Sequence, residues 1–127
     1  MWSRDELGAV ARLCVKHDVT LCSDEVWGEC VLEPEATPFI GMGALCAEVE
    51  GLRERLIVIS SPSKVFNVAC TDIAYAAIPG EALRRAFIRV GADKAEVTPF
   101  GFAVHMDPSR CVWIPLVTSA IHPLSDH

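Results

Sequence analysis

The sequence contains no apolar run long enough to cross a bilayer, and this absence removes one large class of proteins. A membrane-spanning helix needs about 20 consecutive apolar residues, whereas the longest apolar stretches here have the length of strands. Residues 1–5 include no apolar segment typical of secretory signal peptides. They also lack the Arg- and Ser-rich, acid-poor composition of organelle transit peptides. We therefore expect a cytoplasmic protein that does not contact a membrane.

Runs of basic residues are absent as well. Eleven Lys and Arg residues stand against seventeen Asp and Glu residues, which gives a formal net charge of −6. An acidic chain without a basic stripe has little means of neutralising nucleic-acid phosphates. We therefore do not expect nucleic acid as a partner.

The cysteines and histidines lack the short spacings of a structural zinc site. The six cysteines stand at positions 14, 22, 30, 46, 70 and 111, and the four histidines at 17, 105, 122 and 127. No Cys-x-x-Cys or His-x-x-x-His pair occurs among them. Cysteines in cytoplasmic proteins are usually reduced, and they behave as small buried hydrophobic residues. We therefore expect free, buried thiols and no metal site.

What the sequence does contain is an alternation of helix-like and strand-like segments, without internal repeats. Ser3 and Glu6 form a capping box, after which apolar residues recur at helical spacing. The expected elements are a helix over 4–17, a strand over 19–22, a loop over 28–44, a short helix over 44–55 interrupted by Gly51, strands over 56–59 and 73–78, and a helix over 81–90 with Gly91 as its C-cap. This order predicts an α/β fold with a mainly parallel sheet, followed by an irregular tail over 102–127.

Charged residues follow two of the expected strands. Asp24 comes after the first strand, and Lys64 follows the strand over 56–59. In open α/β sheets, ligands bind outside the carboxyl ends of the strands. Charges at strand ends are nevertheless most often solvated loop residues, so these two positions alone do not define a site.

The residues around both positions resemble the paired motif of fold-type-I pyridoxal-phosphate (PLP) enzymes, the aminotransferase class I/II superfamily. Residues 23–27 read Ser-Asp-Glu-Val-Trp, and residues 61–67, about forty positions later, read Ser-Pro-Ser-Lys-Val-Phe-Asn. Residues 71–79 resemble the strand that follows the lysine in this family. The nearest branch is that of the cystathionine β-lyase-like C–S lyases. The resemblance covers residues 1–101 and implies part of a PLP-dependent large domain, whereas residues 102–127 do not match.

The resemblance implies pyridoxal 5′-phosphate as the cofactor and a role for each matching residue. Lys64 would carry the cofactor as a Schiff base and then act as the general base. Asp24 would keep the pyridine nitrogen protonated, so that the ring withdraws electrons from the substrate. Ser61, and less directly Ser63, would bind the cofactor phosphate. Trp27 stands where the family generally has Tyr or His, and its indole can donate a hydrogen bond beside the ring but cannot accept one.

Other positions depart from the family pattern. Asp72 occupies the place of a basic phosphate-binding residue found in many aminotransferases, which favours the C–S lyase branch. Segments that supply the phosphate-binding turn and the arginine for the substrate carboxylate have no match, so the resemblance implies a fragment. The expected function is a C–S β-lyase or an aminotransferase that acts on a small amino-acid substrate, from a homodimeric parent enzyme. The alternative is a truncated, non-catalytic remnant or interaction domain.

Overall fold

A computed structural model describes residues 1–30, 38–69 and 73–91 of the chain. The expected tail over 102–127 lies outside these ranges, as do Cys70 and Asp72. No helix within the described ranges is both long and apolar enough to span a membrane.

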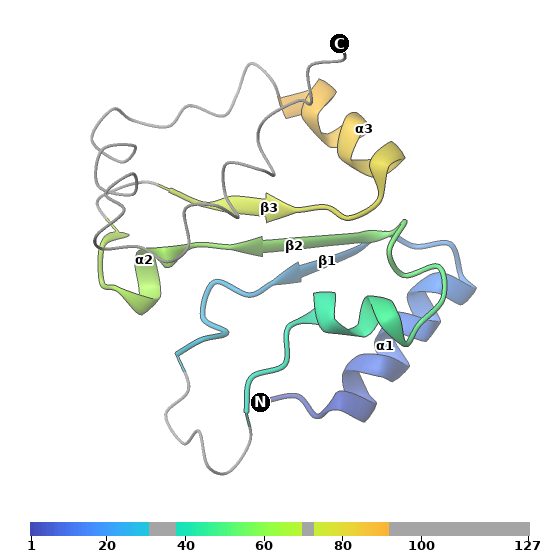
Figure 1. Cartoon of the computed structure of the whole chain (residues 1–127), viewed down its shortest axis with the longest axis horizontal. Coiled ribbons are helices and arrows are strands. Elements are labelled where there is room, and N and C mark those ends of the chain that lie inside the picture. Colours follow the sequence, from blue (N-terminus) through green and yellow to red (C-terminus); the bar gives the residue numbers. More distant parts are fainter. Residues whose placement is uncertain (31–37, 70–72, 92–127) are drawn as a thin grey trace.

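The described residues form a three-stranded sheet in the order β1-β2-β3 (Figure 1). The strands are β1 (Leu21–Asp24), β2 (Leu56–Ser60) and β3 (Tyr75–Ala77). Strand β1 runs parallel to β2, whereas β3 runs antiparallel to it. The predicted α/β fold is therefore confirmed, and among the described strands one pairing is parallel and the other antiparallel.

Strand β1 begins two residues later than the sequence predicts. The backbone amide of Val19 donates to the Cys14 carbonyl at 2.8 Å, so this residue still belongs to the end of the preceding helix. Asp18 turns the chain with a φ of 55°, a left-handed conformation that short polar residues tolerate. Pairing with β2 runs from Leu21 to Asp24. Asp24 is therefore the last residue of β1 and not a loop residue.

The described residues also form three α-helices. Helix α1 (Arg4–Lys16) begins with the predicted capping box, in which Ser3 and Glu6 each bond the other's backbone amide. The backbone amide and the hydroxyl of Ser3 both donate to Oε2 of Glu6, and these bonds lower the pKa of Glu6 because they favour the charged carboxylate. Helix α2 (Pro62–Val65) follows β2 directly, and helix α3 (Glu81–Gly91) follows β3.

The predicted helix over residues 44–55 is wrong. The structure has a 3-10 helix, η1 (Met42–Ala47), followed by a series of turns. Gly51 has a φ of +82°, which breaks the helical path and which side chains other than hydrogen rarely permit. The amide of Leu52 accordingly donates to the carbonyl of Val49, three residues back. These tight turns bring the chain from η1 into β2.

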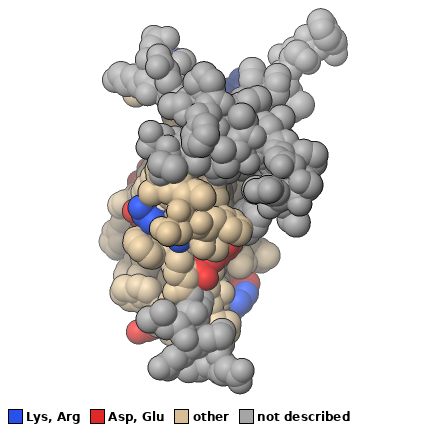
Figure 2. Space-filling view, turned by 90° about the vertical axis from the view of Figure 1, so that its left-hand side faces the viewer, with Lys and Arg blue, Asp and Glu red and all other residues tan. Residues whose placement is uncertain are grey.

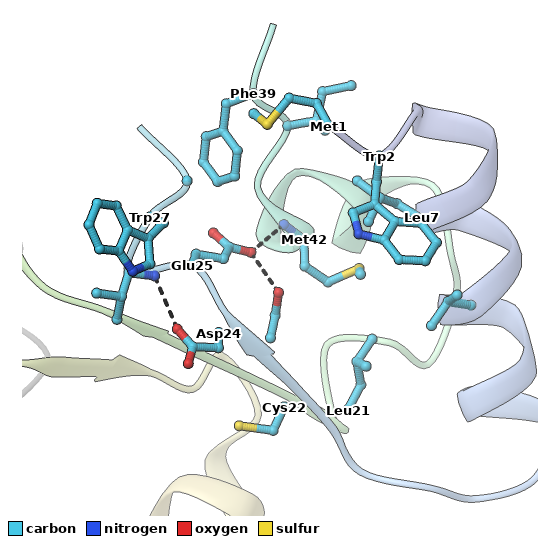
Figure 3. A pocket seen from close by; sticks show the side chains of 15 residues that line it. Met1, Trp2, Leu7, Leu21, Cys22, Asp24, Glu25, Trp27, Phe39 and Met42 are labelled. Carbon is cyan, nitrogen blue, oxygen red and sulfur yellow. Dashed lines mark hydrogen bonds between the residues drawn. The ribbon is translucent and has the colours of Figure 1, made fainter. Parts of the chain in front are cut away.

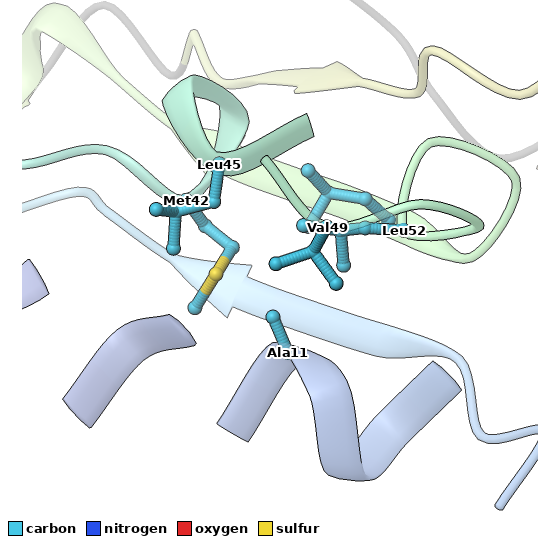
Figure 4. Close-up of a cluster of buried hydrophobic side chains, with 6 residues drawn as sticks. Ala11, Met42, Leu45, Val49 and Leu52 are labelled. Carbon is cyan, nitrogen blue, oxygen red and sulfur yellow. The ribbon is translucent and has the colours of Figure 1, made fainter. Parts of the chain in front are cut away.

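The hydrophobic core lies between α1, η1 and the sheet (Figure 4). Its buried members come from residues far apart in sequence: Ala11, Met42, Leu45, Val49, Leu52 and Leu56. Leu21 of β1 and Val58 of β2 pack against this cluster from the sheet. The core therefore fixes β1 and β2 relative to α1, and it sets the position of the strand ends.

The expectation of buried cysteines is wrong for the cysteines that the structure describes. Cys22 is exposed, and Cys14, Cys30 and Cys46 are only partly buried; all four are free thiols. Cys22 lies on the face of β1 opposite Leu21, so its side chain points away from the core. Burial raises the pKa of the Cys46 thiol above its usual value.

Candidate cofactor site

The carboxyl ends of β1 and β2 lie side by side at one edge of the sheet, the left-hand side of Figure 1. Asp24, the last residue of β1, pairs with Ile59 of β2. Helix α2, which carries Lys64, begins directly after β2. The parallel pairing thus places the acid and the lysine at the same edge. Figure 2 looks onto this edge, where acidic and basic side chains lie close together on a mostly uncharged surface.

Lys64 lies over the ring of Trp27. Its Nζ is 5.8 Å from the ring centroid, within the range of a cation–π contact. Trp27 follows β1 and is 67% exposed, so one side of its indole faces the lysine and much of the ring faces solvent. The sequence predicted Trp27 as a contact of the cofactor, and the structure places it beside the residue expected to bond that cofactor.

Asp24 has an exposed side chain at the end of β1. Its Oδ1 accepts a hydrogen bond of 3.1 Å from the backbone amide of Val26, which holds the carboxylate at the strand end. Among the described residues, Val26 is the one hydrogen-bond donor to this carboxylate. The carboxylate therefore retains acceptor capacity for a protonated ring nitrogen, which is the chemistry expected of it.

Ser61 and Ser63 are both buried at the start of α2. Ser61 is the N-cap, and its Oγ accepts a 3.1 Å hydrogen bond from the amide of Ser63. The two hydroxyl oxygens are hydrogen-bonded at 2.8 Å, and Ser61 also donates to the carbonyl of Ile73 at 2.5 Å. Ser61 can therefore bind a phosphate only if its proton turns from Ile73 to the ligand, so both serines fit a phosphate less directly than the sequence implies.

An open cavity of about 810 Å³ lies next to the end of β1 (Figure 3). Asp24, Glu25 and Trp27 line it on one side. Trp2 and Leu7 of the N-terminal segment line it on another. Figure 3 shows the carboxylate of Glu25 pointing toward Met42, a contact that the sequence gave no reason to expect. Its partner is a backbone amide, so no residue type in the sequence marks it.

The sequence profile of the family described as aminotransferase class I and II matches residues 1–93. The chain belongs to this family. Pyridoxal phosphate is the cofactor of the family, and a solved structure similar to this chain, a putative aminotransferase from Clostridium difficile 630, is described as PLP-bound. That structure is 28% identical to this chain with a TM-score of 0.64, and the match covers 80% of this chain and 25% of the other.

Relatives of known sequence include both aminotransferases and a lyase. The putative aminotransferase YugH of Bacillus subtilis is 32% identical over 71% of this chain and 21% of its own length. The cystathionine beta-lyase PatB of the same organism is 31% identical over 68% of this chain and 21% of its own length. The crystal structure of OvoB is 32% identical with a TM-score of 0.71, covering 80% of this chain and 26% of OvoB. The chain thus spans about a fifth of the curated relatives it matches.

Proposed function

We propose that this chain forms the lysine-bearing edge of a PLP-dependent enzyme of amino-acid metabolism, with Lys64 as the residue that bonds the cofactor. One observation carries the proposal: parallel pairing of β1 and β2 puts Asp24 and Lys64 at one sheet edge, with Trp27 beside the lysine. A lysine and a carboxylate at adjacent strand ends match the two anchoring groups that the cofactor needs.

When bound, the cofactor supplies an aldehyde for covalent attachment and a pyridine ring that withdraws electrons from the α-carbon of the substrate. The Nζ of Lys64 would bond the cofactor through this aldehyde, with loss of water. Once the substrate amine has taken its place, the freed amine of Lys64 would be the base for the α-proton. The carboxylate of Asp24 would accept a hydrogen bond from the protonated ring nitrogen. The indole of Trp27 would cover one side of the ring against water. Ser61, beside Ser63, would donate to the phosphate once its proton turns away from Ile73.

Between the two reactions known among its relatives, we propose a C–S β-lyase acting on a small amino acid. Asp72 in place of a basic residue supports this choice, and so does the similarity to the cystathionine beta-lyase PatB. Aminotransfer is the second candidate, because YugH is described as a putative aminotransferase. The proposed setting is the cytoplasm and a homodimeric enzyme, without nucleic acid or membrane as partners.

Trapping of the cofactor tests the proposal. The 127-residue chain is incubated with PLP, reduced with borohydride and digested, and the modified lysine is located by mass spectrometry. We expect modification at Lys64 that saturates with PLP concentration and disappears in Lys64→Ala. Lys16→Ala, which removes an exposed lysine of α1, is the matched control and should trap PLP as the wild type does.

Modification that is equal at Lys16 and Lys64 and does not saturate would refute the proposal and favour a non-catalytic remnant. If Lys64 is loaded, the reaction is then identified with a C–S-linked amino acid. Release of a thiol together with ammonia indicates a β-lyase, whereas amino transfer to a 2-oxo acid indicates an aminotransferase.

A further inference from the structure

Glu25 follows Asp24 directly, and the proposed function gives it no role. Its backbone amide donates to the carbonyl of Ile59 at 2.8 Å, which extends the β1–β2 pairing one residue beyond Asp24. Its carbonyl accepts from the amide of Gly28 at 2.9 Å and from the hydroxyl of Ser60 at 3.4 Å. The backbone of Glu25 therefore closes the turn that contains Trp27 and joins this turn to the end of β2.

The side chain of Glu25 makes a second set of contacts. Its Oε1 accepts hydrogen bonds from the hydroxyl of Ser23 at 2.9 Å and from the backbone amide of Met42 at 2.7 Å (Figure 3). Met42 begins η1 and is 95% buried in the core. The carboxylate thus ties the strand end that carries Asp24 to the core through the segment over 38–42.

The segment over 38–42 also carries Phe39, which packs on the turn over 25–28 that contains Trp27. A Cβ added at Gly28 would lie 2.3 Å from Cζ of Phe39, so the aromatic ring touches the backbone of this turn. The side chain of Trp27 is 67% exposed, and within the described part of the chain the contact recorded for its ring is the one with Lys64. Its place beside Lys64 therefore depends on the turn, and the turn depends on the segment that Glu25 holds.

We propose that Glu25 is a positioning residue of the cofactor site: by binding the amide of Met42, it fixes Asp24 and Trp27 relative to Lys64. This inference rests on the proposed function, and it adds a residue that does not touch the cofactor. It requires the hydrogen-bond acceptor at Oε1, and not the negative charge as such.

Two substitutions separate the acceptor from the charge. Glu25→Gln keeps an acceptor at Oε1 and places its amide nitrogen near Gly41, which the other carboxylate oxygen faces. Glu25→Ala removes both contacts. Glu29→Ala is the matched control, since it removes an exposed carboxylate from the same stretch of chain.

The measurements use the full chain in a Trp2→Phe, Trp113→Phe background, so that Trp27 is the one tryptophan and its emission is excited selectively over that of Tyr75. We expect Glu25→Ala to weaken PLP trapping on Lys64 about tenfold, equivalent to about 1.4 kcal/mol. We also expect it to lower the fluorescence anisotropy of Trp27 without PLP, because the indole moves more freely. Glu25→Gln and Glu29→Ala should stay within about threefold of the parent in trapping (about 0.65 kcal/mol) and keep its anisotropy.

The outcomes discriminate between the two proposals. If the parent traps PLP at Lys64 and Glu25→Ala traps it equally well, the role of Glu25 is refuted while the proposed function stands. An equal loss of PLP trapping in Glu25→Gln and Glu25→Ala also refutes the role of Glu25, because retaining the hydrogen-bond acceptor then makes no difference. If the parent itself fails to load Lys64, the proposed function and the inference both fall. Where circular dichroism shows that Glu25→Ala is unfolded, Glu25→Asp decides instead, since its shorter side chain withdraws the acceptor by about 1.5 Å from Met42.

Discussion

The contact between Phe39 and Gly28 makes a quantitative prediction about the turn next to Asp24. A methyl group added at Gly28 would lie 2.3 to 2.9 Å from three carbon atoms of the Phe39 ring. Carbon atoms attract best at about 3.5–4.0 Å, so the ring must move by about 1 Å or more. Overpacking of this kind costs about 1–3 kcal/mol.

A double-mutant cycle isolates this cost. Gly28→Ala also stiffens the unfolded chain, which stabilises the protein by about 0.4–1 kcal/mol where the backbone conformation allows alanine. In a Phe39→Ala background the clashing ring atoms are gone, so only this stabilisation remains. Because the effect on the unfolded chain cancels in the cycle, the coupling energy between the two sites equals the overpacking cost, about 2 kcal/mol.

Urea unfolding followed by far-UV circular dichroism gives the four free energies of unfolding by linear extrapolation. The wild type, both single variants and the double variant are compared at one protein concentration. A coupling energy below about 0.5 kcal/mol, within the range of independent sites, would show that Phe39 does not pack on this turn. The geometry that supports Trp27 would then be wrong as well.

Three further predictions concern the core and the first helix. Leu52→Ala should lower the free energy of unfolding by about 2–5 kcal/mol, because Leu52 is fully buried; Leu13→Ala, on the exposed face of α1, should change it by less than about 0.5 kcal/mol in the same urea titration. Ser3→Ala should cost about 1 kcal/mol by removing the N-cap. Since Ser3 lowers the pKa of Glu6 in the folded chain, the stabilisation from Glu6 is complete above its unfolded pKa of about 4.5 and is lost as the pH falls through the folded value. The difference in stability between wild type and Glu6→Ala should therefore shrink below about pH 4.5, and a difference that grows there would contradict this reasoning.

The elements that the sequence predicted correctly are those specified by neighbouring residues. Helix α1 follows from the capping box at Ser3 and Glu6 and from its apolar spacing, and β2 follows from a run of aliphatic residues. The expected helix over 44–55 failed, because the chain leaves the helical path at Gly51, which has a positive φ. The sequence marked Gly51 as an interruption, but it did not indicate that the residues before it form a 3-10 helix and turns.

The residues of the candidate site also fall into those that the sequence predicted and those that it could not predict. The motif around Asp24 and Lys64 placed both residues at strand ends, and the structure brings them to one edge, although their chemical roles stay predictions. The role of Glu25 could not be predicted, because its partner is the backbone amide of Met42, seventeen residues further along the chain. A backbone donor has no identity in the sequence, so only the folded path of the chain reveals it. Ser61 shows the converse, since its bond to Ile73 competes with the ligand role that the motif implies.

The parallel register of β1 and β2 also bears on the order in which the chain folds. Leu21 pairs with Leu56, so the sheet cannot begin to form until α1, β1 and the whole crossover between the strands have been synthesised. The hydrogen bonds and the cap of helix α1 are local, so we expect this helix to form first. Its apolar face stays exposed to solvent until η1 and β2 pack against it. During translation, the edge that carries Asp24 therefore exists only after β2 has left the ribosome, and Lys64 follows within a few residues.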